Sequence, residues 1–261
     1  MSKKKIALFI NSRLGIKVLK YLHSQQNALI QFIVINEENK RSQEFLKELT
    51  NTLSNLDSVY TIVEYNDLDL EKLPEFEYGV SAMFGHIIED KLIDKAKKDF
   101  VNLHPSLLPI GRGANPISWS VIDNKPQGVT IHKLTSKLDA GDIYVQAQVD
   151  FRIEANAAAI YVKLTESLLG LFVNFFQDWI SGNLIASKQP ELGVSSHRIS
   201  DLESVRKIDA KEILTAEQFV RRIQALDFSN GTSAVFQDAT GIEWSIRLSL
   251  EAKNKTWGVP D

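Results

Sequence analysis

The segment NLHPSLLPIGRG, residues 102–113, places an amide and an imidazole two residues apart at the end of a predicted strand. Side chains at that spacing on a strand point to the same face, so Asn102 and His104 should converge. Acyl transfer needs a base for the proton of the nucleophile and a donor for the oxygen that becomes negative. His104 and Asn102 suit these roles. An isolated Asn-x-His pair is nevertheless more often structural, because buried imidazoles and amides commonly only satisfy hydrogen bonds.

A third polar group is expected from the segment KLDAGDIY, residues 137–144. Asp139 lies there in a loop just before a predicted strand, where a carboxylate can orient and stabilise a protonated imidazole. Gly141 allows the backbone to approach a ligand closely. Asp142, nearer the strand, is interpreted as a loop or strand-entry residue.

The elements that position these residues are short apolar runs alternating with stretches of helical period. This pattern predicts an α/β fold, a Rossmann-like and mostly parallel sheet with flanking helices. The strands expected in the first part of the chain are Ile6–Ile10, Leu29–Ile35, Val59–Tyr65, Tyr78–Phe84 and Phe100–His104, with helices after the first strand and over Lys40–Leu49 and Lys91–Lys97. The last of these strands delivers Asn102 and His104 at its carboxyl end, where ligands of open α/β sheets collect.

The rest of the chain predicts further strands over Val129–Leu134 and Ile143–Val149 and a long amphipathic helix that ends near Gly182. Beyond residue 182 periodicity is lost and then returns. We therefore expect a catalytic domain over residues 1–182, a linker over 183–210, and a small C-terminal α+β subdomain over 211–261. The elements predicted in that subdomain are a helix over Thr215–Leu226, a turn at Asn230-Gly231-Thr232, and strands over Ser233–Gln237 and Glu243–Leu250.

Composition limits the class of protein. With 44% hydrophobic and 24% charged residues the chain is globular, and its net charge of −3 gives no field that would attract nucleic acid. The absence of cysteine excludes disulfides, thiolate nucleophiles and cysteine metal sites, and no histidine spacing resembles a zinc site. The apolar run after MSKKK stops at Asn11, too short for a signal peptide or membrane span. We expect a cytoplasmic protein without membrane or nucleic-acid partners.

Several motifs occur together in a fixed order: Asn-x-His-Pro-Ser-Leu-Leu-Pro from Asn102, Gly111-Arg112-Gly113 followed by Pro116 and Trp119, GVTIH over residues 128–132, and LDAGDI over residues 138–143. This set resembles the folate-dependent formyltransferase family. The resemblance covers about residues 5 to 180, and a weaker similarity continues over residues 221–228. It reverses the balance between a structural and a catalytic interpretation of the Asn102 and His104 pair.

The resemblance implies a reaction and a set of site residues. An amine attacks the formyl carbon of the co-substrate 10-formyltetrahydrofolate, with no metal, and Asn102, His104 and Asp139 carry the step. The residues expected at the folate are Met83, Phe84, Gly85, His86 and Ile88 in one loop and Thr135, Lys137 and Leu138 in another. Those expected at the amine substrate are Asn11, Ser12 and Arg13. Arg112 is a candidate for binding a phosphate or the folate carboxylate. His132 lies near the sugar or is simply a polar position on a half-buried strand.

The identity of the amine is open among several members of the family. Residues 201–261 hold eight Lys and Arg against ten Asp and Glu, a net of −2, which disfavours initiator tRNA. The first loop lacks the glycine-rich form of the glycinamide ribonucleotide enzyme, and no regulatory domain of a formyltetrahydrofolate hydrolase precedes the first strand. GANPISW with GVTIH is most similar to the sugar N-formyltransferases of surface-polysaccharide pathways. We therefore expect a nucleotide-linked aminodeoxysugar as substrate and a homodimer, with the hydrolase, methionyl-tRNA formyltransferase and a non-catalytic folate- or nucleotide-binding protein as alternatives.

Overall fold

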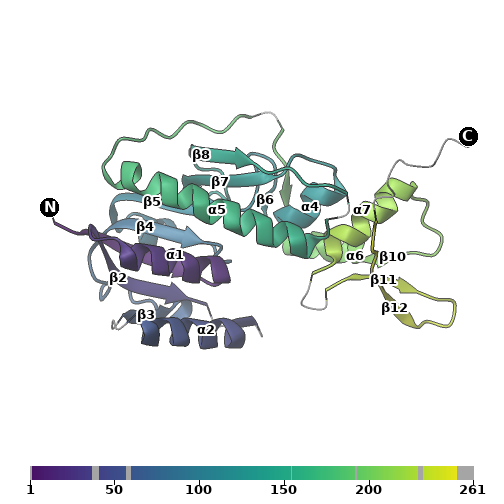
Figure 1. The fold of residues 1–261 in the computed structure, drawn as a ribbon, viewed down its shortest axis with the longest axis horizontal. Helices are drawn as coiled ribbons and strands as arrows, with labels where there is room; N and C mark the ends of the chain where they lie inside the picture. Colours follow the sequence, from purple (N-terminus) through teal and green to yellow (C-terminus); the bar gives the residue numbers. More distant parts are fainter. Residues whose placement is uncertain are drawn as a thin grey trace, which may run out of the picture.

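The computed structural model describes residues 2–36, 41–56, 60–153, 155–191, 193–228 and 232–251. Its centre is a sheet with the strand order β3-β2-β1-β4-β5-β7-β8 (Figure 1). These strands are β1 (Lys4–Ile10), β2 (Ala28–Ile35), β3 (Thr61–Glu64), β4 (Phe76–Ala82), β5 (Ala96–His104), β7 (Gly128–Lys133) and β8 (Ile143–Gln148). The strands from β3 to β5 are parallel, whereas β7 and β8 are antiparallel to their neighbours. The predicted mostly parallel α/β fold is confirmed.

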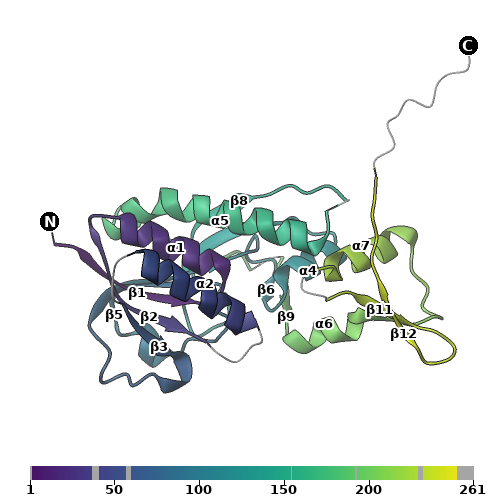
Figure 2. The same ribbon diagram turned by 60° about the horizontal axis from the view of Figure 1, so that its bottom comes forward.

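Helices cover one face of this sheet, as Figures 1 and 2 show for α1, α2 and α5. The helical elements of the described chain are α1 (Arg13–Ser24), α2 (Arg41–Asn55), the 3-10 turn η1 (Tyr65–Asp67), α3 (Asp90–Ile93), α4 (Pro116–Ile122), α5 (Ala157–Ile180), α6 (Ile199–Arg206) and α7 (Ala216–Leu226). The apolar stripe of α5 is fully buried at Leu168, Phe172 and Phe176. Burying one such side chain contributes about 1.5 to 3 kcal/mol, so this helix anchors the core.

The other face of the sheet is covered by loops and by the short helical turns η1 and α3. Phe9, Phe32, Phe76 and Phe100 form a second apolar cluster there, against residues 65–73 and 84–93. The Phe100 ring packs directly on Gly79 of β4, where a side chain would clash, because a Cβ at residue 79 would lie 2.4 Å from that ring. This second cluster fixes the segment that follows β4, which contains one of the predicted folate loops.

Several predicted boundaries are wrong: β5 starts at Ala96 and not at Phe100, and α2 ends at Asn55 and not at Leu49. The helix expected over Lys91–Lys97 is only the single turn of α3, because β5 already begins at Ala96 and pairs with β4. The fourth strand ends at Ala82, since Met83 has a φ of 53° and turns the chain away from the sheet. The last strand ends at Ile246, where its pairing stops. The predicted strand start at Val59, the helix start at Lys40 and the turn at Asn230 and Gly231 lie outside the described residues.

The segment over residues 183–210, expected as a linker, contains structured elements. These are β9 (Ser196–His197), α6 and β10 (Lys207–Ile208). β9 pairs in parallel with β6 (Arg112–Gly113), which belongs to the Asn102–Gly113 motif. The segment therefore contacts the predicted site, while the division of the chain into domains remains a prediction.

The C-terminal part is small, as predicted. β10, β11 (Ala234–Gln237) and β12 (Glu243–Ile246) form a sheet beside α6 and α7 (Figure 1). A reciprocal cap begins α7: Thr215 Oγ1 accepts from Gln218 N–H, and Gln218 Oε1 accepts from Thr215 N–H. The apolar core of this C-terminal part is formed by the buried side chains of Ile208, Ile223, Leu226 and Ala234.

Among the described helices, α5 alone has the length and apolar composition of a membrane span. Its apolar side chains pack into the core against the sheet. The central helix of a globular domain can have the same length and apolar composition as a membrane span.

Candidate active site

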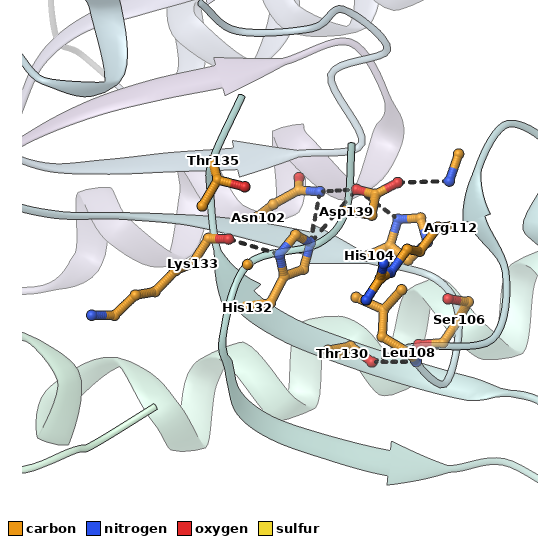
Figure 3. A network of polar contacts seen from close by, with 12 residues as sticks. Asn102, His104, Ser106, Leu108, Arg112, Thr130, His132, Lys133, Thr135 and Asp139 are labelled. Atoms are coloured by element: carbon orange, nitrogen blue, oxygen red, sulfur yellow. Dashed lines mark hydrogen bonds and ion pairs between the residues drawn. The ribbon is translucent and has the colours of Figure 1, made fainter. Parts of the chain in front are cut away.

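The predicted pair at the end of β5 faces a third polar side chain from β7. The antiparallel register aligns Asn102 with His132 and His104 with Thr130. Directly aligned residues on neighbouring strands present their side chains to the same face. Figure 3 shows Asn102, His132 and His104 converging on Asp139, which arrives from the loop after β7. The structure thus brings together the three predicted catalytic residues and His132.

Asp139 is the centre of this cluster, and 9% of its side chain is exposed. Its Oδ2 accepts from the Gly113 N–H at 2.8 Å, and its Oδ1 accepts from Asn102 Nδ2 at 3.2 Å. Oδ1 also lies 3.6 Å from His104 Nδ1 and 3.6 Å from His132 Nε2. Burial opposes ionisation of this carboxyl, but His104, His132 and the Gly113 N–H together hold its pKa below the usual range. Asp139 is therefore ionised at neutral pH.

The protonation of His104 follows from its neighbours. Its Nε2 lies 2.9 Å from the Gly111 carbonyl oxygen, which can only accept, so Nε2 carries the proton. Nδ1 is then the unprotonated nitrogen, and it faces Asp139. Burial lowers the pKa of His104 below 6.5, while the charge of Asp139 acts in the opposite direction. At neutral pH His104 is a neutral base beside a carboxylate that would stabilise its protonated form.

Asn102 is held by both of its amide hydrogens. His132 Nδ1 donates to the Lys133 carbonyl at 2.8 Å, so His132 Nε2 is an acceptor when the ring is neutral. Asn102 Nδ2 lies 3.2 Å from this Nε2 and 3.2 Å from Asp139 Oδ1. Both contacts are at the long end of the hydrogen-bond range. An oxyanion can therefore receive a hydrogen from Asn102 when the amide gives up one of these partners.

Glycines let the backbone close around Asp139, which itself has a φ of 47°. Gly113 has a φ of 85°, and a Cβ there would lie 2.5 Å from the His197 carbonyl oxygen. A Cβ at Gly141 would lie 1.9 Å from the Lys133 carbonyl oxygen. A side chain at either position would displace the loop that carries Asp139. The predicted close approach at Gly141 is to the protein's own backbone.

The first predicted folate loop, residues 83–88, is anchored by two buried side chains. Phe84 and Ile88 are each 2% exposed and pack in the second apolar cluster. Between them Gly85 has a φ of 86° and open space where a Cβ would lie, and His86 stacks on Tyr65. Gly85 is exposed beyond the carboxyl end of β4, whereas the Ile87 carbonyl accepts from the Tyr65 hydroxyl. The other predicted loop, Thr135 to Leu138, is exposed, and Thr135 Oγ1 donates to the Lys137 carbonyl.

The residues predicted to bind the amine substrate are separated. Ser12 caps α1 by accepting from Gly15 N–H at 3.3 Å and reaches the Ala82 carbonyl at 3.4 Å, so it joins the ends of β1 and β4. Arg13 is directed to α2, where it pairs with Glu44 and Glu48. Asn11 is half-buried at the end of β1. Their roles at a substrate stay predictions.

Arg112 is hydrogen-bonded to Gln189, a residue that the sequence did not indicate as part of the site. Its Nε and Nη2 donate to Gln189 Oε1 at 3.0 and 2.6 Å. Gln189 lies in a segment without periodicity, so no sequence signal pointed to it. A role of Arg112 at a phosphate or carboxylate remains a prediction. Among the described residues, no group of three or more His, Asp and Glu side chains is arranged to hold a metal ion.

Curated relatives share this chain's sequence over part of their length. The dTDP-4-amino-4,6-dideoxyglucose formyltransferase of Mycobacterium tuberculosis is 31% identical over 151 residues, which are 58% of this chain and 64% of that protein. A methionyl-tRNA formyltransferase of Listeria monocytogenes is 27% identical over 195 residues, 72% of this chain and 56% of that protein. The chain thus spans less than two thirds of the length of these relatives.

Solved structures share the fold over more of the chain. A 4-N formyltransferase from Francisella tularensis superposes with a TM-score of 0.81 at 23% identity, over 96% of this chain and 99% of that chain. A formyltransferase from Anoxybacillus kamchatkensis, in complex with UDP-4,6-dideoxy-4-formamido-L-AltNAc and tetrahydrofolate, has a TM-score of 0.52 at 29% identity, over 67% of this chain and 88% of that chain. A family model described as formyl transferase matches residues 17–173, which include the whole cluster around Asp139. The chain belongs to the formyl transferase family.

Proposed function

We propose that this protein transfers the formyl group of 10-formyltetrahydrofolate to the amino group of a nucleotide-linked aminodeoxysugar. The observation that supports the proposal best is the neutral, buried imidazole of His104 with its free Nδ1 3.6 Å from an ionised carboxylate. This pair can take a proton from an attacking amine and stabilise the resulting imidazolium. Asn102 lies beside it as a donor for the oxygen that becomes negative.

The proposed reaction proceeds in two steps. The amine nitrogen attacks the formyl carbon, its proton passes to His104 Nδ1, and the carbonyl oxygen becomes an oxyanion that accepts from the Asn102 amide. The bond from the formyl carbon to N10 of the folate then breaks, and His104 returns the proton to N10. The products are a formamide and tetrahydrofolate, so atoms and charge balance without a metal. Asp139 keeps its negative charge throughout and stabilises the protonated state of His104.

Folate is proposed to lie against residues 83–88 and 135–138. The open backbone around Gly85 suits a flat ring that is recognised through main-chain groups, and Phe84 and Ile88 keep this loop fixed to the core. The relative from Anoxybacillus kamchatkensis was solved with tetrahydrofolate, which supports the same co-substrate here.

The nucleotide-linked aminosugar is favoured over tRNA by charge and by relatives. The net charge of −2 over residues 201–261, from eight basic and ten acidic residues, does not suit a polyanion. The named relatives from Mycobacterium and Anoxybacillus act on or bind nucleotide-linked sugars. We also propose a cytoplasmic homodimer that serves polysaccharide biosynthesis. The exposed Trp244 of β12 and Ile242, which precedes that strand, support self-association, and a monomer in sedimentation at micromolar concentration would contradict it.

The decisive experiment offers the purified chain 10-formyltetrahydrofolate with a panel of dTDP- and UDP-linked 3-amino and 4-amino sugars. Mass spectrometry should show one sugar in which a formyl group replaces a hydrogen, together with stoichiometric tetrahydrofolate. The His104→Asn variant is the control, because it should bind folate without forming product. Formate release without any sugar would instead show a hydrolase, and formylation of methionyl-tRNA alone would show the tRNA enzyme. Folate binding without turnover would leave a binding protein.

A further inference from the structure

The return segment, defined here as residues 183–191, follows α5 and runs back along the outer edge of β8 (Figure 1). It is joined to that edge by two backbone hydrogen bonds between Ser187 and Ile143, of 2.7 and 2.8 Å. The family match ends at residue 173, so this segment lies outside the matched part of the chain. The side chain of Gln189 in this segment hydrogen-bonds to the Asp139 loop and to Arg112.

The Gln189 amide makes every hydrogen bond that its two polar atoms readily allow. Nε2 donates to the carbonyl oxygens of Asp139 at 2.8 Å and of Gly141 at 2.7 Å. Oε1 accepts from Arg112 Nε at 3.0 Å and from Arg112 Nη2 at 2.6 Å. An amide with two donor hydrogens and two acceptor lone pairs is thereby satisfied. Gln189 joins three separate pieces of chain: the return segment, the Asp139 loop and the Arg112–Gly113 strand.

These contacts reach Asp139 from two sides. The backbone of Asp139 has a φ of 47°, a conformation that costs a non-glycine residue on the order of 1 kcal/mol and needs support from its surroundings. Gln189 binds the carbonyl of that same residue. On the other side it binds Arg112, and the next residue, Gly113, donates its N–H to Asp139 Oδ2 at 2.8 Å.

We propose that Gln189 is a positioning residue for Asp139: its amide holds the loop that carries the carboxylate and, through Arg112, the Gly113 N–H that binds it. The proposal rests on the formyl-transfer function proposed above. Without Gln189 the carboxylate should move away from His104, and the imidazolium should lose its stabilisation. Misplacement of a catalytic group by about 1 Å can cost on the order of 100-fold in rate, so a loss of about 10- to 100-fold in kcat is expected.

The first test measures His104 directly and needs no turnover. The titratable groups that face His104 are Asp139 and His132, while the nearby guanidinium of Arg112 is bound by Gln189. Because the charge of Asp139 raises the pKa of His104, displacing that charge should lower it. NMR titration of the five histidines, with His104 assigned by its loss in His104→Asn, should show this shift in Gln189→Met and in Asp139→Asn. An unchanged His104 titration in folded Gln189→Met would overturn the proposal.

A matched control is available on α5. Gln177 also uses both amide atoms, donating to Gln25 Oε1 and accepting from Asn27 Nδ2, but at the exposed surface. Gln177→Met makes the same chemical change and should leave the His104 titration and kcat at the wild-type values. Gln189→Glu gives a second test, because it preserves the size and shape of the side chain. The variant keeps an acceptor for Arg112 but places a carboxylate oxygen against the carbonyl oxygens of Asp139 and Gly141. It should lose at least as much activity as Gln189→Met, and wild-type activity would contradict the inference.

The second test is a double-variant cycle. If Gln189 acts through Asp139, adding Gln189→Met to Asp139→Asn should lower kcat by less than about threefold further, because the affected interaction is already gone. Losses that multiply would show an independent, merely structural role. Failure of the wild-type chain to formylate any aminosugar would refute the proposed function, whereas the NMR titration would still decide the role of Gln189.

Discussion

The charged side chains of Arg222 and Asp139 are both largely buried, and they are held in opposite ways. Arg222 of α7, 8% exposed, donates to the carbonyls of Val205 and Lys207 at 2.5 and 2.9 Å and to Glu212 at 2.6 Å. Asp139 has one short contact, to a backbone N–H, and longer ones to Asn102 and two imidazoles. Short bonds to groups that keep their protonation state lock a side chain in place. Longer contacts to groups that change protonation state permit a proton to move. The first arrangement suits a role in stability, and the second suits the proposed chemistry.

The largest expected effect is on turnover at His104. His104→Asn removes the proposed base for the proton of the amine, so kcat should fall by on the order of 100- to 10,000-fold. Folate affinity should change little, because the His104 side chain is buried and offers little surface to a ligand. Single-turnover rates and equilibrium folate binding measure the two quantities. A near-normal rate in a folded variant would show that another group is the base.

Asn102→Ala should lower turnover by roughly 100- to 1000-fold, because it removes the donor for the oxyanion. The same change also removes the hydrogen bonds of the amide to Asp139 Oδ1 and His132 Nε2. A double variant of Asn102 and His104 should therefore be measured beside the single variants. If Asn102 and His104 act on one transition state, as proposed, their combined loss should be smaller than the product of the single losses. Fully multiplicative losses would argue that the two residues act at separate steps.

Replacing Arg222, the buried charge of the C-terminal part, should lower the free energy of unfolding and leave turnover unchanged. Arg222→Met leaves the carbonyls of Val205 and Lys207 without this donor, which should cost about 2 to 6 kcal/mol of unfolding free energy at 1 to 3 kcal/mol per unpaired group. Arg221→Met is the matched control, because Arg221 pairs with Glu217 one helical turn away and such pairs contribute about 0.3 to 0.5 kcal/mol. Urea unfolding gives both values. Equal shifts in the two variants would remove the basis for the comparison.

A smaller difference should separate two neighbouring carboxylates. Asp139→Asn removes the charge beside His104, whereas the structure gives Asp142 a backbone contact, its carbonyl accepting from Lys133 N–H. At saturating substrates the two variants should differ in turnover by at least about tenfold, or roughly 1.4 kcal/mol in barrier. Circular dichroism should confirm equal folding. A larger loss in Asp142→Asn would place the third catalytic residue elsewhere in the loop.

The smallest expected effect is a displacement of the pH profile. His104 must be neutral to act as a base, so kcat/KM should fall as the pH drops through its pKa, which burial holds below 6.5. Asp139 opposes that depression. In Asp139→Asn the acid limb should therefore move to lower pH while the plateau falls. A limb that moves to higher pH, or that stays in place, would mean that Asp139 does not act on His104.

The sequence predicted the parts of this arrangement that depend on local periodicity. Alternating apolar residues located β5 and β7, and the two-residue spacing put Asn102 and His104 on one face. Asp139 was found from its motif, and its proximity to His104 required the chain to return from β7. Contacts that depend on packing alone were missed. Nothing around Gln189 indicates that it reaches two carbonyls of the Asp139 loop, and nothing around Arg13 indicates that it turns to α2. Lys91–Lys97 misled the helix prediction because charged residues at the exposed start of β5 mimic a helical surface.

The pairing of β6 with β9 also determines where this chain can be recombined with its relatives. A chimaera joined directly after α5 would exchange Gln189 and Ser195 to His197 for foreign residues, although Gly111, Arg112 and Ala114 hydrogen-bond to Ser195 and His197. A junction placed after His197 keeps those partners from one parent. Exchange of C-terminal units for altered substrate choice should therefore succeed at the second junction and yield poorly active hybrids at the first.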